Sequence, residues 1–403
     1  MKYDVVVIGA GPAGSTAAKF LSEKGVKVLL IDKKKFPRDK PCGGAIPVRA
    51  LKRFKYIEEK DLIESYTYGA YLHLSSLEHN VEVQGNEPLF AMVLRKKFDD
   101  GLVKLAIDSE ATFLDGKTAA DIKIFEDNAK VMLDDGTAIE SQIVIGADGV
   151  WSTIAKKSGL SQTSKNIGIG LFQEYPMSRV LIDRYFTEKR LAHLYTTFQG
   201  LEGYGWVFPK KDHVNIGIGE IRTRRGQSKG KVNLKAVYKS YIKILKENDI
   251  IPKSLRIGRV KGGAVPTRPV EKTYADRVLL CGDAAGLINP VTCDGINYAM
   301  SSGQIAANVT AEALESSDTR EKFLSKYETI WKNDFGKDIK LFLRVQNQWG
   351  EKTEKFLKLV SRDKKISEMA LGIVTGNLRM HKYRWKLSRR TLYLYLKDLL
   401  YKT

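Results

Sequence analysis

The stretch Tyr3–Asp32, YDVVVIGAGPAGSTAAKFLSEKGVKVLLID, decides the fold. Its apolar start predicts a strand over residues 3–8, and residues 15–24 have the spacing of a helix with one apolar face. A second apolar run, residues 26–31, predicts another strand, which ends at Asp32. Strand, glycine-rich turn, helix, strand and acid in this order predict a dinucleotide-binding βαβ unit.

The turn after the first strand carries three glycines with separate tasks. Gly9 permits the tight turn, Gly11 lets the backbone approach a pyrophosphate, and Gly14 allows the helix to pack closely on the strand. The helix N-terminus then faces the phosphates with free amides and its positive dipole end. Asp32, 18 positions after Gly14, is placed to accept hydrogen bonds from a ribose. A plain βαβ crossover without a ligand is the alternative.

Composition excludes several classes of protein. The chain has 403 residues, of which 43% are apolar, so a disordered chain is excluded and more than one sub-domain is expected. Its three cysteines are too few for a disulfide scaffold or a four-cysteine iron–sulfur cluster, and they fit a reducing compartment. The sequence has no run of eighteen apolar residues, so we expect no membrane span. The five histidines show no metal-ligand spacing, so no metal is expected.

The charge is unevenly distributed. The net charge is +20, and residues 319–403 carry 21 basic and nine acidic side chains. Nucleic acid, an anionic membrane surface, a phosphorylated substrate or a solvated lysine-rich surface would each fit such an excess. Residues 379–403 combine eight basic residues with five aromatic ones, which is typical of a helix in a membrane interface. A packed C-terminal helix with a basic outer face is the equal alternative.

Two further motifs follow the first in order. VIGADGVWS (residues 144–152) and VLLCGDAAG (residues 278–286) each end an apolar strand in an aspartate, Asp148 and Asp283. Either aspartate alone could cap a helix. Together with the N-terminal turn, the three motifs resemble the FAD-dependent flavoproteins of the glutathione-reductase and aromatic-hydroxylase type.

That resemblance implies the cofactor and its contacts. In such proteins the aspartate equivalent to Asp283 holds the ribityl or pyrophosphate region of FAD, and the backbone at Gly295 and Ile296 faces the flavin. Arg95, before a predicted helix, matches the family's arginine that contacts FAD. The cofactor is expected to be noncovalent. We expect these residues to bind it: Gly9, Gly11, Pro12, Ala13, Gly14, Asp32, Lys33, Cys42, Gly43, Gly44, Arg95, Asp148, Asp283, Gly295 and Ile296.

Strand-like alternation in residues 66–94 and 167–221 predicts antiparallel sheet between the βαβ-like parts. With the resemblance, this gives an α/β fold: a Rossmann-like FAD-binding domain, an inserted antiparallel β-sheet substrate domain and a C-terminal helical region. The expected boundaries are residues 1–65, 95–166 and 257–315 for the FAD domain, 66–94 and 167–256 for the substrate domain, and 316–403 for the basic helical region.

Two segments narrow the family. KPCGGAIP (residues 40–47) and GYGWVFPK (residues 203–210), the latter leading to VNIGIG (residues 214–219), are similar to the geranylgeranyl reductase family. The resemblance implies hydride transfer from reduced FAD, with protonation, to a double bond of a polyprenyl chain. Prenyl diphosphate, a chlorophyll-type ester, an archaeal prenyl lipid and a menaquinone side chain are the candidate substrates. The family's Thr-Gly-Glu-Gly-Ile reads Thr-Cys-Asp-Gly-Ile here, with Cys293 in place of the first glycine, and the role of that thiol is open.

The expected catalytic residues lie in these two segments. Tyr204, Trp206 and Phe208 alternate, so all three rings share one face of a strand and can line a water-excluding tunnel. Cys42, in a glycine-rich loop expected to curl over the flavin, can relay a proton or position the chain. An ordinary aromatic core and a buried, inert thiol are the alternatives.

Other readings remain open at this point. A flavin monooxygenase or halogenase would use the same scaffold, and a non-catalytic prenyl-lipid carrier would share the fold. Because no second glycine fingerprint is present, the electron donor, NADPH or ferredoxin, is expected to dock transiently. The expected location is the cytoplasm, peripherally on the inner face of the membrane, with no nucleic-acid partner.

Overall fold

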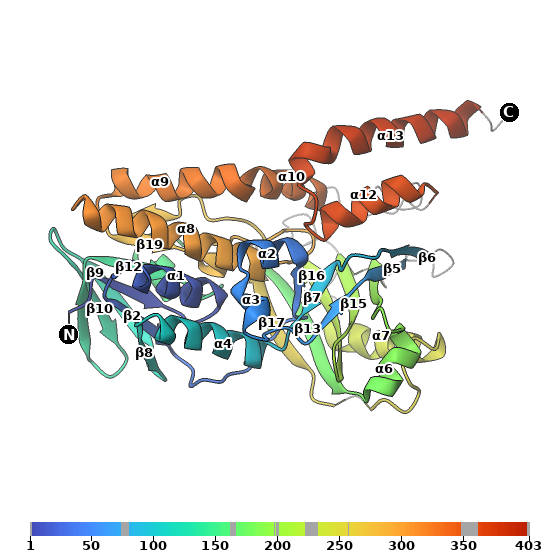
Figure 1. The fold of residues 1–403 in the computed structure, drawn as a ribbon, viewed down its shortest axis with the longest axis horizontal. Helices are drawn as coiled ribbons and strands as arrows, with labels where there is room; N and C mark the ends of the chain where they lie inside the picture. The colour runs from blue at the N-terminus through green and yellow to red at the C-terminus, as the bar shows by residue number, and fades with distance from the viewer. Residues whose placement is uncertain are drawn as a thin grey trace. The chain divides into compact units, whose positions relative to one another are not determined.

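The structure is a computed structural model that describes residues 2–73, 80–161, 167–196, 198, 201–221, 233–256, 258–347 and 362–400. The chain forms two compact units, whose elements are labelled in Figure 1. Unit 1 contains Met1–Lys40, Arg95–Asn166 and Val265–Lys340. Unit 2 contains Pro41–Leu94, Ile167–Ala264 and Leu341–Thr403.

Unit 1 is built on a six-stranded sheet whose strands are parallel except for β18 at one edge. Strand β1 lies in the interior, between β2 and β12, where the strand order reverses direction. In sheets of this kind, ligands bind outside the carboxyl ends of the strands at that reversal. The strands in spatial order are β18 (Tyr274–Ala275), β19 (Val278–Leu280), β12 (Ile143–Gly146), β1 (Val5–Ile8), β2 (Val28–Asp32) and β8 (Thr112–Asp115).

Helices cover this sheet because its central strands are apolar on both faces. Every residue of β1, β2 and β12 is buried. The helices of unit 1 are α1 (Pro12–Ser22), α4 (Arg95–Asp108), α5 (Thr153–Lys157), η3 (Gly282–Ala285), α8 (Ile296–Glu315), α9 (Glu321–Trp331), η4 (Lys332–Gly336) and the start of α10 (Lys337–Gln346). A separate antiparallel sheet contains β9 (Ala119–Ile124), β10 (Ala129–Leu133) and β11 (Ala138–Ser141).

Helices α1 and α8 lie side by side (Figure 1). They approach closely because a glycine is present at the crossing: a Cβ on Gly303 of α8 would lie 2.2 Å from the carbonyl oxygen of Ala13. A side chain there would force the helices apart. The crossing therefore fixes α8 against the helix that follows the glycine turn.

Unit 2 is built on a seven-stranded mixed sheet, in which β14 and β5 are parallel and the other described pairs are antiparallel. Its order is β17 (Lys261–Pro266), β13 (Ile167–Pro176), β16 (His213–Ile221), β15 (Gly203–Pro209), β14 (Ala192–Thr196), β5 (Gly69–His73) and β6 (Asn80–Gln84). A small sheet places β7 (Phe90–Met92) between β3 (Ala45–Pro47) and β4 (Ser65–Thr67). The helices are α2 (Val48–Arg53), α3 (Tyr56–Glu59), α6 (Arg179–Phe186), α7 (Leu234–Glu247), α12 (Lys364–Val374) and α13 (Met380–Leu400).

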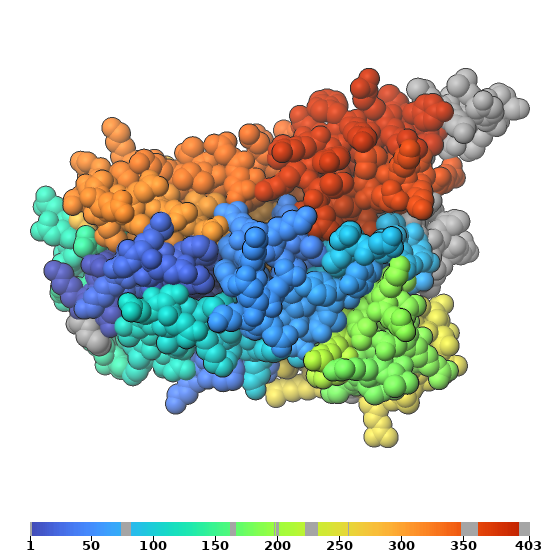
Figure 2. All heavy atoms as spheres, in the orientation of Figure 1, coloured from blue at the N-terminus to red at the C-terminus, as the bar shows by residue number. Residues whose placement is uncertain are grey.

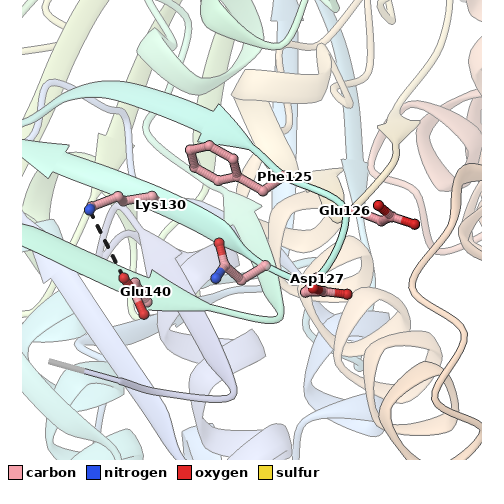
Figure 3. Close-up of a pocket in the computed structure, with 6 residues that line it drawn as sticks. Phe125, Glu126, Asp127, Lys130 and Glu140 are labelled. Atoms are coloured by element: carbon pink, nitrogen blue, oxygen red, sulfur yellow. Dashed lines mark ion pairs between the residues drawn. The ribbon is translucent and has the colours of Figure 1, made fainter.

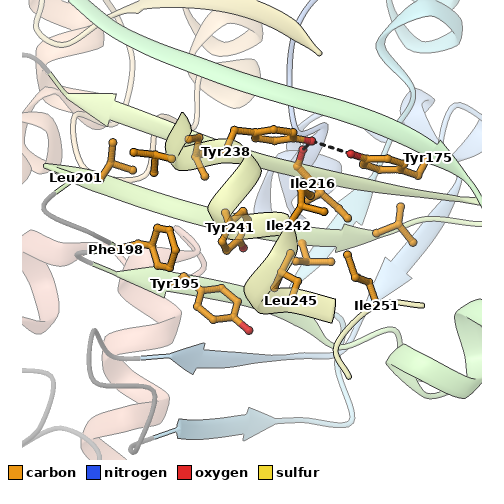
Figure 4. Close-up of a cluster of buried hydrophobic side chains, with 14 of the residues drawn as sticks. Tyr175, Tyr195, Phe198, Leu201, Ile216, Tyr238, Tyr241, Ile242, Leu245 and Ile251 are labelled. Atoms are coloured by element: carbon orange, nitrogen blue, oxygen red, sulfur yellow. Dashed lines mark hydrogen bonds between the residues drawn. The ribbon is translucent and has the colours of Figure 1, made fainter. Parts of the chain in front are cut away.

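One face of the large sheet forms a core with α6 and α7 (Figure 4). Tyr241 of α7 is fully buried, and its ring packs where a side chain at Gly205 would lie, 2.8 Å from that Cβ position. The hydroxyls of Tyr238 and Tyr175 lie 3.1 Å apart, and Tyr238 also donates to the carbonyl of Ile216. This face is closed by its own core, so the strand residues of β15 that alternate with Gly205 point to the other face.

The predicted α/β fold class is confirmed, with a parallel nucleotide-binding sheet, antiparallel strands and C-terminal helices. Elements begin and end within a few residues of the predicted bounds: the first helix is Pro12–Ser22 instead of residues 15–24. Helix α7 begins at Leu234, with Asn233 as its N-cap, and residues 229–232 lie outside the described part of the chain.

The division into units differs from the expected domains. Residues 41–65 fall in unit 2, because β3 and β4 both pair with β7. The C-terminal helices also divide at Lys340 instead of forming a region of their own. Such pairings between segments far apart in sequence have no periodic signal.

Helix α13 contains most of the basic C-terminal stretch. Asp363, the N-cap of α12, holds α13 through a bidentate ion pair with Arg390 (2.9 and 2.8 Å). Residues 380–394 of α13 are all half-buried or exposed, and none is buried. The space-filling view shows the red surface of this C-terminal part (Figure 2). Among the described residues, no helix is long and apolar enough to cross a membrane.

Candidate active site

Gly9 and Gly14 are required by the packing of the first turn. Gly9 has φ of +102°, and a Cβ there would lie 2.3 Å from the carbonyl oxygen of Ala147, at the end of β12. A Cβ on Gly14 would lie 1.8 Å from the carbonyl oxygen of Gly9. The turn is therefore pressed against both its own helix and the neighbouring strand.

Gly11 has a different environment. The one described atom within 4 Å of its Cβ position, apart from its chain neighbours, is Nη2 of Arg38, at 3.6 Å. Helix α1 begins next to it at Pro12, and the amides of its first turn, including that of Ala13, have no acceptor within the helix. Open space, free amides and a nearby guanidinium together fit a diphosphate group.

Asp32 ends β2 beside this turn and is buried, with 8% of its surface exposed. One carboxylate oxygen accepts the amide of Ala10 (2.8 Å) and the other accepts that of Lys34 (2.8 Å). Each oxygen retains lone pairs for a further donor, such as a ribose hydroxyl. The side chain of Lys33, also predicted to bind the cofactor, is exposed.

Arg95, the first residue of α4, is held by a carboxylate that sequence reasoning missed. Asp99, one turn along, is fully buried and accepts both Nε (2.7 Å) and Nη2 (2.8 Å) of Arg95. Nη1 of Arg38 lies 2.9 Å from the same carboxylate. The two guanidiniums share the Asp99 carboxylate, and Nε of Arg38 also lies 3.9 Å from the carboxylate of Asp32. Guanidinium donors grouped in this way suit a diphosphate. The spacing of Arg95 and Asp99, i and i+4 on one helix, was the available signal.

Asp148 uses its carboxylate to cap a helix. It accepts the hydroxyl of Ser152 (2.5 Å) and the amides of Thr153 (2.7 Å) and Ile154 (3.2 Å), at the start of α5. Burial raises the pKa of the Asp148 carboxyl, and these hydrogen bonds act in the opposite direction. A contact of Asp148 with the cofactor stays a prediction.

Asp283 and Gly295 meet at the N-terminus of α8. A Cβ on Gly295, the N-cap residue, would lie 3.5 Å from Oδ1 of Asp283. Ile296 begins the helix. The turn before it is organised by the buried Asn289, whose Oδ1 accepts the amides of Val291 (2.9 Å) and Thr292 (3.2 Å). Asn289 is a second residue that sequence reasoning did not assign to the site.

Cys293, in the same turn, has φ of +55°, in the left-handed region. Glycine adopts this conformation without cost, which explains the glycine of the family pattern. Burial, with the carboxylates of Asp283 and Asp294, raises the pKa of the Cys293 thiol to about 12. The thiol is therefore neutral at ordinary pH, which speaks against a role as a thiolate nucleophile.

In unit 2, the three aromatic residues of β15 lie on the face of the sheet away from α7. Ring centroids are 5.6 Å apart for Tyr204 and Trp206 and 6.2 Å for Trp206 and Phe208. Trp206 and Phe208 are each 8% exposed, and Tyr204 is half-buried. They belong to an apolar cluster with Ala70, Phe90, Met92, Phe172 and Ala192, against which Ala45, Leu89, Leu194 and, from α12, Leu371 pack.

The loop containing Cys42 lies directly on these rings. A Cβ on Gly43 would lie 2.9 Å from the Phe208 ring and 3.2 Å from Nε1 of Trp206. Gly44 has φ of +78°, and a Cβ there would lie 2.2 Å from the carbonyl oxygen of Val93. The Gly44 amide donates to Sγ of the half-buried Cys42 (3.4 Å). The two glycines thus let the loop contact the aromatic face.

Figure 3 shows a shallow pocket of about 450 Å³ at the turn between β9 and β10. Apart from Phe125, it is lined by polar and charged side chains, and its Lys130 and Glu140 approach to 4.0 Å. None of its lining residues belongs to the three motifs or to the aromatic face. The lining residues are Phe125, Glu126, Asp127, Asn128, Lys130 and Glu140.

Comparison with known proteins assigns the chain to a protein family. A family model described as FAD binding domain matches residues 2–332. The digeranylgeranylglycerophospholipid reductase of Methanococcus vannielii is 34% identical over 350 residues, 82% of each chain. The chain belongs to the geranylgeranyl reductase family of FAD-dependent oxidoreductases.

Two further proteins are similar to this chain over nearly its whole length. The digeranylgeranylglycerophospholipid reductase of Methanocaldococcus jannaschii is 31% identical, with 99% of this chain and 98% of the relative covered. A geranylgeranyl bacteriochlorophyll reductase-like protein of Thermoplasma acidophilum has a TM-score of 0.79 at 25% identity, covering 95% of this chain and 98% of that one. A flavin-dependent brominase superposes with a TM-score of 0.74, but at 18% identity it shows the fold alone. The geranylgeranyl reductase prediction is confirmed at the level of the family.

Proposed function

We propose that the protein saturates carbon–carbon double bonds in a geranylgeranyl or related polyprenyl chain of a lipid, using noncovalently bound FAD. The observation that carries the proposal is the contact of the Cys42–Gly43–Gly44 loop with Trp206 and Phe208. This contact places the loop that carries the Cys42 thiol against an apolar aromatic face. A proton donor and an apolar surface are the two features that reduction of an isolated alkene requires of the protein. The names of the relatives, reductases of digeranylgeranyl lipids, support an archaeal-type prenyl lipid first among the candidate substrates.

The aromatic face suits a methyl-branched hydrocarbon. A polyprenyl chain offers no hydrogen-bonding groups, so it is held by shape and by exclusion of water. The stacked rings of Trp206 and Phe208, with centroids 6.2 Å apart, offer an apolar surface, and Leu371 of α12 and Leu89 pack against the same cluster. Each isoprene unit placed on this surface removes apolar area from water, at about 25 cal/mol per Å².

Cys42 is the proposed proton donor. Reduced FAD, when bound, supplies the hydride that reaches one carbon of the double bond. The Cys42 thiol gives its proton to the other carbon, so the alkene gains two hydrogens and the sulfur retains the S–H electron pair. The Gly44 amide, which already donates to Sγ, stabilises the negative charge left on sulfur. Water then returns the proton to the thiolate.

The binding of FAD itself is assigned to unit 1. Gly11 and the α1 N-terminus suit the diphosphate, Asp32 the ribose, and Arg38 and Arg95 the phosphate charge. Asp283 and the N-terminus of α8 are proposed for the ribityl and flavin end. NADPH or ferredoxin is proposed as a transient electron donor, since the sequence carries a single glycine fingerprint.

We further propose that α13 attaches the enzyme to an anionic membrane surface, where its substrate resides. Trp385 (66% exposed) and Leu392 (57% exposed) are seven residues apart, so they share one face of the helix. Lys382, Lys386 and Arg389 flank them on that face and are exposed. Aromatic and aliphatic side chains bordered by cations fit the interface of an anionic bilayer.

The decisive experiment is an anaerobic single turnover. Chemically reduced wild-type enzyme is mixed with a digeranylgeranyl phospholipid, a prenyl diphosphate or a menaquinone. The masses of the products are then measured by mass spectrometry. We expect a gain of two hydrogens for each reduced bond, no oxygen, and a loss of about 100-fold or more in rate for Cys42→Ala with FAD retained. The same turnover is repeated under air, and an oxygenated product there would replace the proposal with a monooxygenase. A near wild-type rate for Cys42→Ala would remove Cys42 from the proton step.

A further inference from the structure

Beneath the Cys42 loop lies a buried polar network. Asn215, fully buried on β16, lies between Phe208 of β15 and Glu174 of β13 in the register of the sheet. Its Oδ1 accepts the indole N–H of Trp206 (2.6 Å). Its Nδ2 donates to the carbonyl of Cys42 (3.2 Å) and to Oε1 of Glu174 (2.7 Å). A single amide therefore joins the aromatic face to the backbone of the thiol residue.

The orientation of this amide is set by its neighbours. The oxygen faces a donor that cannot accept, the indole N–H, and the nitrogen faces two acceptors, the Cys42 carbonyl and the Glu174 carboxylate. Turning the amide over would break all three hydrogen bonds. Asparagine is thus the side chain that satisfies this position, because an aspartate would direct a second anionic oxygen at Cys42 and Glu174.

An ion pair fixes the far side of the network. Lys210 is 1% exposed, and its ammonium donates to Oε1 of Glu174 (2.5 Å) and to the carbonyl of Val93 (2.9 Å). The same ammonium lies 3.0 Å from the Cβ position of Gly44. The network therefore contacts both sides of the loop: Asn215 at Cys42 and Lys210 at Gly44.

The network is not explained by stability alone. Burying an ion pair is offset by the loss of hydration, so a buried pair is poor evidence for stabilisation. Here the second oxygen of Glu174, Oε2, is buried without a hydrogen-bond partner in the described part of the chain. An incompletely satisfied carboxylate is a cost that an apolar replacement would avoid. The contacts of the network with both sides of the loop favour a role in specifying one geometry of the loop.

We propose that Asn215 is a positioning residue for Cys42, and that the Lys210–Glu174 pair locks its amide in place. The thiol and the Trp206 ring then keep one relative position, so an alkene lying on the ring meets the proton donor at a fixed distance. This inference rests on the proposed role of Cys42. It predicts that loosening the network impairs proton delivery without removing any group that touches substrate.

The test compares Asn215→Leu with a matched control, Asn377→Leu. Asn377 is a half-buried asparagine of the same unit, whose amide donates to the carbonyl of Leu89 (3.4 Å). Lys210→Met is likewise compared with Lys211→Met, since Lys211 is exposed next to it. Two quantities are measured on the FAD-loaded enzyme: the rate of Cys42 alkylation by iodoacetamide, followed by peptide mass spectrometry, and the single-turnover rate.

We expect Asn215→Leu and Lys210→Met to retain FAD. Alkylation of Cys42 should accelerate at least about fivefold, and turnover should fall at least about tenfold, because a small misplacement of a reacting group is costly. The controls should stay within about twofold of wild type. Alkylation and turnover both at wild-type rates in Asn215→Leu would overturn the inference.

A second variant covers a failure of Asn215→Leu to fold. Trp206→Phe removes the N–H donated to Asn215 while keeping an aromatic ring, and faster alkylation of Cys42 in it supports the link. Unchanged alkylation there overturns it. Alkylation does not depend on any prenyl substrate, so a wild-type enzyme that reduces no polyprenyl chain would refute the proposed function while leaving this readout intact.

Discussion

The indole of Trp206 occupies the space in which a side chain at position 217 would lie. A Cβ on Gly217, the cross-strand neighbour of Trp206, would come within 2.1 Å of Cζ2 of the indole. The glycines of the VNIGIG segment thus clear the sheet surface so that a large ring can lie flat on it. The position of the Trp206 ring therefore depends on the glycines of the neighbouring strand.

Gly217→Ala should therefore displace the indole. Forcing a methyl group into this contact costs about 1–3 kcal/mol, and it should break the hydrogen bond from Trp206 to Asn215. We expect a higher KM or a changed order of bond reduction, measured by product mass spectrometry. Gly219→Ala is the matched control, because its Cβ would lie at an ordinary 3.6 Å from the indole. Equal behaviour of the two variants would contradict this account.

Asp99→Asn should weaken retention of FAD. It removes the carboxylate that Arg38 and Arg95 share, and breaking a buried ion pair costs about 3–5 kcal/mol. Flavin absorbance after gel filtration measures the loss, and thermal unfolding measures the destabilisation. The control is Asp100→Asn, at the residue next to Asp99. It removes only an ion pair with the exposed Lys104, so it should retain FAD. Full flavin content in Asp99→Asn would show that the two arginines hold their positions without it.

Cys293→Gly should stabilise the protein. A side chain in the left-handed region costs roughly 1–2 kcal/mol, which glycine avoids, so the melting temperature should rise by about 1–2 °C for a chain of this length. Cys281→Ala, at a buried position with φ of −128°, should give no such gain. Flavin content and turnover should be preserved in Cys293→Gly. Loss of either would assign a chemical role to the thiol.

Acid should destabilise unit 2 through His193. Its ring is buried, with Nδ1 2.9 Å from Nε2 of His73, and burial together with His73 lowers the pKa of His193 to about 3. The unfolded chain takes up a proton below about pH 6.5, and the folded chain does so only near pH 3, so stability falls as pH drops through that window. At pH 5 the loss is about 2 kcal/mol. Urea unfolding at pH 7 and 5 tests this, with a shallower pH dependence expected for His193→Gln.

Neutralising the exposed face of α13 should weaken membrane binding. Each basic residue near an anionic surface contributes about 1 kcal/mol, so the triple change Lys382→Gln, Lys386→Gln and Arg389→Gln should reduce vesicle affinity about 100-fold. Co-sedimentation with anionic and with neutral vesicles measures it. The control neutralises Lys235, Lys239 and Lys243, which are exposed on α7. Equal binding of wild type to neutral and anionic vesicles would count against the electrostatic attachment.

The sequence predicted the features that have a local pattern. The βαβ unit at Tyr3–Asp32 combines strand, turn and helix signals within thirty residues, and the structure contains each of them. The period-two spacing of Tyr204, Trp206 and Phe208 correctly predicted rings on one face. In both cases the information lies in residues that are neighbours in the chain.

What the sequence did not predict depends on contacts between distant segments. Arg38 and Asp99 are far apart in the chain and meet only after β2 and α4 pack. Glu174 lies on β13, Asn215 lies on β16 and Lys210 directly follows β15. In the sequence, each is an ordinary polar residue of a strand or turn. The role of a buried amide or charge depends on its hydrogen-bond partners, and no pattern in a single sequence identifies those partners.

The division of each unit into three chain segments has a consequence for biosynthesis. Strand β19, at Val278–Leu280, pairs with β12 in the central sheet of unit 1, although β1 and β2 are complete by Asp32. A nascent chain emerging from the ribosome must therefore keep an unfinished parallel sheet until residue 280 has been made. Domains generally fold as units during synthesis, and unpaired strand edges favour aggregation. We expect this enzyme to gain yield from slower translation or chaperones, and we expect neither unit to be expressible as a single uninterrupted fragment of the gene.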